Sequence, residues 1–204
     1  MNKISRKTYK PECLVNKAQV WTNHFILKRQ IDPNYWHWHQ YKYEKVDNIL
    51  AKILSELSNF HCSYCGIFPL KQSVGGRSID HFKPKSQFQD LAFEWYNLFI
   101  ACPDCQKIKG SKFPDIAPLK PDSCHYHFDY WFEIDWTINK NHIIPNKDRN
   151  QKEQIIAQKT IDWLGLNDGD RPQARFDELE KYNGSEILDV MKWSYPFFLE
   201  RGKY

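Results

Sequence analysis

The chain has 204 residues with 29 lysines and arginines against 25 acids, and its net charge of +4 is only a weak indication of a nucleic-acid partner. Its length suits one extended domain, and 41% hydrophobic residues with 16% aromatics exclude a disordered chain. No run of about 18 uninterrupted apolar residues is present and the N-terminus lacks the apolar core of a signal peptide, so we expect a cytoplasmic protein without a membrane partner.

The first 30 residues are strongly basic, because seven lysines and arginines stand there against the single acid Glu12. A segment with this charge either contacts a phosphate backbone or is a solvated basic arm, and the residue types do not decide between the two. The basic residues are Lys3, Arg6, Lys7, Lys10, Lys17, Lys28 and Arg29.

Apolar residues at helical spacing predict two amphipathic helices within the first 60 residues. Between the two, after Pro33, lies an aromatic run. A histidine-rich tract can bind metal, but tryptophans among the histidines favour packing or a partner contact. The first helix rests on Leu14, Ala18, Trp21 and Phe25, the second on Val46, Leu50, Ile53, Leu54 and Leu57, and the aromatic run is Tyr35, Trp36, His37, Trp38 and His39.

Residues 60–114 have a different pattern, with short apolar runs interrupted by Gly75-Gly76, Pro84 and Pro103. This pattern predicts a hairpin and a short helix. The two glycines are not followed by the Lys-Ser/Thr of a phosphate-binding P-loop. Any dependence on ATP must therefore come from a partner.

The C-terminal part begins with a proline-rich linker at Pro114, Pro118 and Pro121. Residues 128–138 then predict one or two strands. A helix is expected from about residue 148 to 164, ending at Gly165 in the left-handed cap conformation, and Asp170 could cap another helix.

Two CxxC pairs, separated by residues 66–101, provide the strongest local signal. Two thiolates at CxxC spacing can occupy adjacent corners of a tetrahedron, so two pairs complete a closed structural zinc site with no position for a reactive water. Buried apolar cysteines and a redox CxxC are the alternatives. The pairs are Cys62 with Cys65 and Cys102 with Cys105, while Cys13 and Cys124 lie outside the set. Cys124 with His125 and His127 could mimic a second metal site, but a structural role is favoured there.

Between the pairs lie Asp80-His81 and Asn97-Leu98, and Lys109-Gly110 follows the second pair. In this order the chain resembles the HNH family over residues 62–114. The resemblance implies a ββα-metal fold, with His81 as the general base, Asp80 as a ligand of a catalytic cation and Asn97 as the residue that holds the loop of the base. These residue types suit those roles, because an imidazole titrates near neutral pH and a carboxylate binds Mg²⁺ or Mn²⁺.

The position that completes the family's metal site is Gln106 here, where the family has His or Asn. Glutamine offers an amide oxygen but is neutral and longer than Asn, so this departure puts the second ligand in doubt. Lysines flank the expected cleft and are candidates for contacts with nucleic-acid phosphates. These are Lys83, Lys85, Lys107, Lys109 and Lys112.

More widely, the chain is similar to the HNH subunits of retron and Septu phage-defence systems. The supporting segments are residues 79–86, 95–98, 109–114 and 160–167. This resemblance implies an ABC-type ATPase as partner, sometimes with a reverse transcriptase and its small DNA. It also implies that the flanking helices form docking surface outside the active site, with aromatics either as anchors or as ordinary core. The candidate anchors are Trp36, Trp38, Trp193, Tyr195, Phe197 and Phe198.

We therefore expect an α+β fold, a mainly helical scaffold carrying a zinc-stapled ββα-metal module. Its parts would be a helical region with a basic segment at 1–60, the HNH module at 61–114 and a mainly helical region at 115–204. The expected function is metal-dependent hydrolysis of nucleic acid, with DNA favoured. A zinc-dependent nucleic-acid-binding or scaffold subunit is one alternative, favoured by Gln106, and an HNH ribonuclease acting on host RNA is another.

Overall fold

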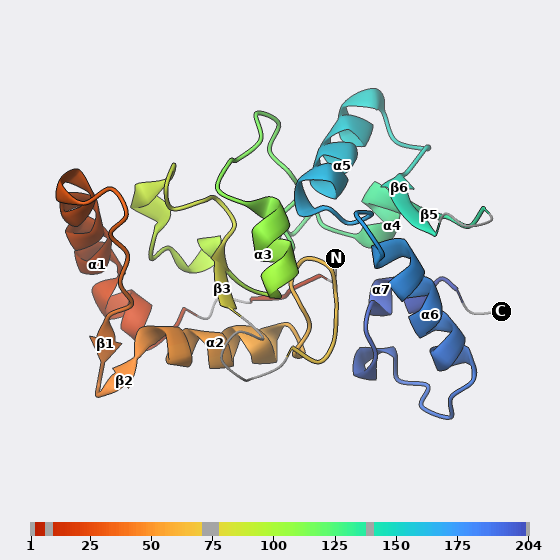
Figure 1. Ribbon diagram of the computed structural model, residues 1–204, viewed down its shortest axis with the longest axis horizontal. Helices are drawn as coiled ribbons and strands as arrows, with labels where there is room; N and C mark the ends of the chain where they lie inside the picture. Colours follow the sequence, from red (N-terminus) through yellow and green to blue (C-terminus); the bar gives the residue numbers. More distant parts are fainter. Residues whose placement is uncertain (1–2, 7–9, 71–77, 138–140, 203–204) are drawn as a thin grey trace.

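The computed structural model describes residues 3–6, 10–70, 78–137 and 141–202, which extend from α1 at one end to α6 at the other (Figure 1). Lys7 of the basic segment and the Gly75-Gly76 pair lie outside the described residues. A search of the described helices finds none with the length and apolar character needed to span a membrane.

The N-terminal part contains the two helices predicted from apolar spacing, α1 (Glu12–Ile31) and α2 (Val46–Leu57). Both predictions are confirmed, because the buried residues of the two helices include Leu14, Trp21 and Phe25 in α1 and Val46, Leu50 and Leu54 in α2. A small antiparallel hairpin, β1 (Gln40–Tyr41) with β2 (Glu44–Lys45), connects them. The aromatic run precedes this hairpin and turns back toward the centre of the molecule.

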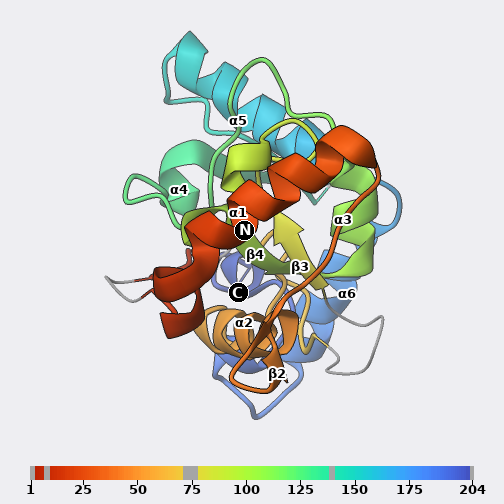
Figure 2. The same ribbon diagram turned by 90° about the vertical axis from the view of Figure 1, so that its left-hand side faces the viewer.

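The central part is a hairpin followed by a short helix, as the sequence predicts. Strand β3 (Ser78–His81) pairs antiparallel with β4 (Leu98–Ala101), so that Asp80 lies opposite Phe99 and His81 opposite Leu98. Two 3-10 turns, η1 (Gln89–Leu91) and η2 (Trp95–Asn97), fill the connection, and α3 (Pro103–Lys109) follows β4 directly. Helix α2 packs on the hairpin, while α1 packs on η1 and lies in front of the strands in Figure 2.

The C-terminal part differs in detail from the predicted elements. Residues 128–131 form a helical turn instead of a strand. The next four residues, Phe132–Asp135, form a strand, which pairs with a second strand, His142–Pro145. Helix α5 starts at Gln151 and ends at Gly165, whose φ of 56° and ψ of 42° confirm the expected left-handed cap. Asp170 precedes α6 but makes no side-chain cap hydrogen bond. The elements are α4 (Phe128–Trp131), β5 (Phe132–Asp135), β6 (His142–Pro145), α5 (Gln151–Leu164), α6 (Arg171–Asn183), η3 (Val190–Lys192) and α7 (Pro196–Leu199).

One residue of the basic N-terminal segment belongs to the core rather than to solvent or a phosphate. Arg6 is buried and its Nε lies 2.7 Å from Asp122 Oδ2. Its guanidinium donates to the backbone carbonyls of Trp95 and Leu98 and stacks over Phe99. Through these contacts the buried arginine anchors the N-terminal segment to the start of β4.

Three of the aromatics considered as partner anchors are also core residues. Tyr195, Phe197 and Phe198 are buried, because α7 packs against α6. Phe197 also stacks on Phe128 with ring centroids 5.0 Å apart. For these three side chains the core alternative is therefore the right one.

Candidate active site

Four cysteines gather at the base of the hairpin. Cys62 and Cys65 come from the turn after α2, Cys102 follows β4, and Cys105 lies in α3. All four are buried, and their Sγ atoms lie within 4.8 Å of one another. Among the described residues this is the one cluster of three or more His, Cys, Asp or Glu ligand atoms, and Cys124 is exposed outside it.

The geometry and the donors of this cluster fit zinc. A zinc–sulfur distance of about 2.3 Å places tetrahedral sulfurs about 3.8 Å apart, and Cys65 Sγ lies 3.8 Å from Cys102 Sγ. Two groups also point N–H bonds at the sulfurs, as a thiolate site requires. The backbone of Cys102 donates to Cys62 Sγ, and Arg171 of α6 donates to Cys105 Sγ at 3.3 Å. The cluster thus joins the hairpin, α3 and α6.

His81 ends β3 and is held in one orientation. Its Nε2 lies 2.8 Å from the backbone oxygen of Ala92, and because a carbonyl can only accept, Nε2 must carry the proton. Burial, then the positive charge of Lys85, lower the pKa of His81 to about 3, so the ring is neutral at pH 7. In a neutral imidazole with a protonated Nε2, Nδ1 is left as the basic nitrogen.

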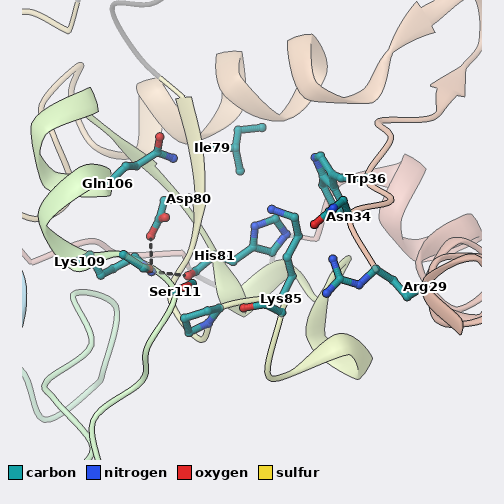
Figure 3. A pocket seen from close by; sticks show the side chains of 13 residues that line it. Arg29, Asn34, Trp36, Ile79, Asp80, His81, Lys85, Gln106, Lys109 and Ser111 are labelled. Carbon is teal, nitrogen blue, oxygen red and sulfur yellow. Dashed lines mark hydrogen bonds and ion pairs between the residues drawn. The ribbon is translucent and has the colours of Figure 1, made fainter. Parts of the chain in front are cut away.

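Asp80 points into the same site and is held from two sides. Its Oδ2 accepts a 2.6 Å hydrogen bond from the hydroxyl of Tyr64 and lies 3.3 Å from Lys109 Nζ. Lys109 is itself buried and donates to the backbone oxygen of His81 (Figure 3). Burial raises the pKa of Asp80, and the charge of Lys109 opposes that rise.

Asn97 holds the chain on both sides of the histidine loop. Its Oδ1 accepts from the backbone N–H of Lys83 at 2.8 Å, and its Nδ2 donates to the backbone oxygens of Lys83 and Leu91. Leu91 is next to Ala92, whose carbonyl holds His81. A single buried amide therefore fixes both the segment after His81 and the segment that orients its ring.

A cavity of about 310 Å³ opens at these residues. Its lining includes residues from three parts of the chain, and Figure 3 shows Arg29 and Trp36 facing Lys85 and His81 across it. Trp36 packs edge-on against His81 with ring centroids 5.1 Å apart. The lining residues are Arg29, Asn34, Trp36, Ile79, Asp80, His81, Pro84, Lys85, Ser86, Gln106, Lys109, Gly110 and Ser111.

Of the second candidate ligand and the five candidate lysines, only some line the cavity. Gln106 lines the cavity with Asp80 and accepts from the hydroxyl of Ser78. Of the five lysines, Lys85 and Lys109 line the cavity. The other three do not: Lys83 lies over the rings of Phe88 and Phe113, and Lys107 and Lys112 are exposed.

A strand carrying Asp-His and a short helix thus line one cavity, and that strand pairs with a second strand that directly follows the asparagine. Residues 62–112 match the family model described as HNH endonuclease. The chain contains an HNH domain. The domain runs from the first cysteine of the cluster to just beyond α3, and it holds all the residues predicted as catalytic or metal-binding.

Two curated relatives share more than the HNH domain. A protein of Vibrio cholerae serotype O1 biovar El Tor with the name "Retron Vc95 putative HNH endonuclease" is 32% identical over 135 residues, 61% of this chain and 60% of that protein. The Septu protein PtuB of Bacillus thuringiensis is 30% identical over 122 residues, 58% of this chain and 41% of that protein. The matched segment is thus less than two thirds of either relative.

The structure adds residues to the site that the sequence did not suggest. Arg29, Asn34 and Trp36 lie outside the HNH domain yet line its cavity. Arg29 belongs to α1, so the expectation that the flanking helices stay outside the active site does not hold for this residue. Tyr64, between two zinc-site cysteines, contacts Asp80. In the sequence, the aromatic run marks Trp36 as a candidate for a contact, whereas nothing distinguishes Arg29 from the other basic residues of the N-terminal segment.

Proposed function

We propose that the protein is a metal-dependent endonuclease that hydrolyses phosphodiester bonds of nucleic acid, with DNA favoured. The observation that carries this proposal is the orientation of His81. The carbonyl of Ala92 fixes the proton on Nε2, and this leaves Nδ1 to take a proton from an attacking water. Asn97 keeps that arrangement rigid through three backbone hydrogen bonds.

Asp80 and Gln106 are the residues that would hold the catalytic cation. They bring a carboxylate and an amide oxygen to one cavity, and these hard donors suit Mg²⁺ or Mn²⁺, which commonly complete their coordination with water and substrate phosphates. A cation bound there would polarise the phosphate and stabilise the leaving oxygen. With so few protein ligands, we expect the cation to bind more firmly when the nucleic acid is present.

We further propose that this nuclease is the effector of an anti-phage defence complex. The two relatives are named for a retron and for Septu. The sequence resemblance implies an ABC-type ATPase as partner, sometimes together with a reverse transcriptase and its small DNA. Helix α1 supports a protein partner, because Val20, Leu27 and Ile31 form an exposed apolar stripe on the helix side opposite Arg29.

Activity assays on two substrates with and without the partner test both parts of the proposal. The chain would be purified alone and with the product of its neighbouring gene, then incubated with plasmid DNA or total RNA and Mg²⁺ or Mn²⁺. We expect cleavage of DNA that needs the divalent cation. Cleavage confined to the complex supports the defence-subunit role, and cleavage by the chain alone contradicts a strict need for the partner. Cleavage of RNA only would contradict the DNA preference, and no cleavage of either substrate in any preparation would contradict the nuclease.

A further inference from the structure

The cavity beside His81 carries an imbalance of charge. Three cations line it, Arg29, Lys85 and Lys109, against one acid, Asp80. The pair of Lys109 with Asp80 at 3.3 Å balances one cation. Among the described residues, no acid lies within ion-pair distance of Arg29 or Lys85, and Asp80 acts on Lys85 only from farther away. Two positive charges therefore line the cavity without an acid in direct contact.

Both of these cations are half-buried. Arg29 lies one and two helical turns after Phe25 and Thr22, both buried, and its Nε is buried without a hydrogen-bond partner among the described residues. Lys85 Nζ lies 4.5 Å from the centre of the Trp36 ring. Burial lowers the pKa of Lys85, the charge of Asp80 opposes that shift, and the charges of Arg29 and Lys109 add to it. Both charges are therefore partly desolvated, which is costly unless an anion binds between them.

We propose that Arg29 and Lys85 bind a phosphodiester group of the nucleic acid and place it beside His81. A guanidinium offers paired N–H donors that match two phosphate oxygens, and an ammonium adds a point charge. The arrangement rests on the proposed nuclease function and extends it, because Arg29 comes from α1 and lies outside the HNH domain. The N-terminal helix would then supply a substrate-binding residue, Arg29, on the side of the cavity that residues outside the HNH domain form.

Binding and cleavage measured separately test this site. Fluorescent single-stranded DNA and RNA of the same sequence would be titrated with the full-length His81→Ala chain, with and without Arg29→Gln. Lys28→Gln is the matched control, since Lys28 is the adjacent exposed cation on the same helix. We expect Arg29→Gln to weaken binding about tenfold or more and to lower its dependence on salt, with Lys28→Gln within about twofold of the parent. Arg29→Lys should lie in between.

A thermal melt separates loss of the site from loss of the fold. Removing a half-buried cation that has no acidic partner should leave the melting temperature unchanged or raise it, so weaker binding at an unchanged melting temperature supports the phosphate site. Binding by Arg29→Gln equal to that of Lys28→Gln overturns it, as does a parent chain that binds neither oligonucleotide.

If Arg29→Gln weakens binding but the unsubstituted chain cleaves nothing, the phosphate site stands and the nuclease proposal fails. If Arg29→Gln binds and cleaves like the unsubstituted chain, the nuclease stands and the site fails.

Discussion

At the scale of single residues, the Asp80 carboxylate is held by two buried side chains. Its two partners, Tyr64 and Lys109, both come from segments that bear zinc-site cysteines. Tyr64 stands between Cys62 and Cys65, and Lys109 ends the helix that contains Cys105. The position of the carboxylate is therefore set by the same segments that form the cysteine cluster.

Removing the Tyr64 hydroxyl should weaken catalysis without releasing zinc. In Tyr64→Phe the ring still fills the core, but Asp80 loses a charge-assisted hydrogen bond and gains freedom. We expect a loss of about 1–3 kcal/mol in the free energy of unfolding and a cleavage rate lower by about tenfold. Zinc content, measured by mass spectrometry of the metal, should stay at the value of the unsubstituted chain. An unchanged cleavage rate would show that the hydroxyl does not position Asp80.

Lys109 should behave as half of a buried ion pair. Lys109→Met leaves Asp80 charged and without its counterion, which we expect to cost about 3–5 kcal/mol of unfolding free energy in urea titrations. The double variant Asp80→Asn with Lys109→Met removes both charges and should recover a large part of that loss. The exposed Lys107→Met serves as the control, with a change within about 0.5 kcal/mol. A Lys109→Met chain as stable as the control would contradict the pairing.

At the scale of elements, the cysteine cluster joins segments from several parts of the fold at one point. The turn after α2, the end of β4 and helix α3 each supply thiolates, and Arg171 brings α6 to the same point. With one strand pair in the central module, this cross-link replaces the large core that a bigger sheet would provide. The zinc site should therefore control the stability of the whole HNH domain.

Cys65→Ser should lose zinc and destabilise the domain, whereas Cys124→Ser should do neither. Both are cysteines, but Cys65 belongs to the cluster and Cys124 is exposed. We expect one zinc per unsubstituted chain, less than half of that in Cys65→Ser, and a melting temperature lower by about 10 °C or more. Full zinc content in Cys65→Ser would mean that the cluster is not the zinc site.

The elements also show which features the sequence could predict. Helices α1 and α2 follow from apolar spacing, the end of α5 from Gly165, and the hairpin and α3 from short apolar runs and prolines. Lys107 and Lys109 look alike in the sequence, although side chains two residues apart on a helix point about 200° away from each other. Only the packing of α3 on β3 decides that Lys109 turns inward, so this pairing could not be predicted from a local pattern.

At the scale of the whole molecule, the HNH domain is completed by chain on either side of it. The N-terminal helix and aromatic run form one wall of the cavity through Arg29 and Trp36, and α6 supports the cysteine cluster through Arg171. His81, Asp80 and the cysteines could be predicted because they lie in one short segment with fixed spacing. Arg29 could not, since its place at the site depends on a contact between segments about 50 residues apart.

The most direct measurement is the cleavage rate of His81→Ala beside that of the unsubstituted chain, in the same preparation and with the same divalent cation. Zinc content and melting temperature would be measured on both samples. Cleavage should fall by at least about a hundredfold, with zinc content unchanged and the fold intact. Undiminished cleavage by a folded, zinc-loaded His81→Ala chain would contradict the account.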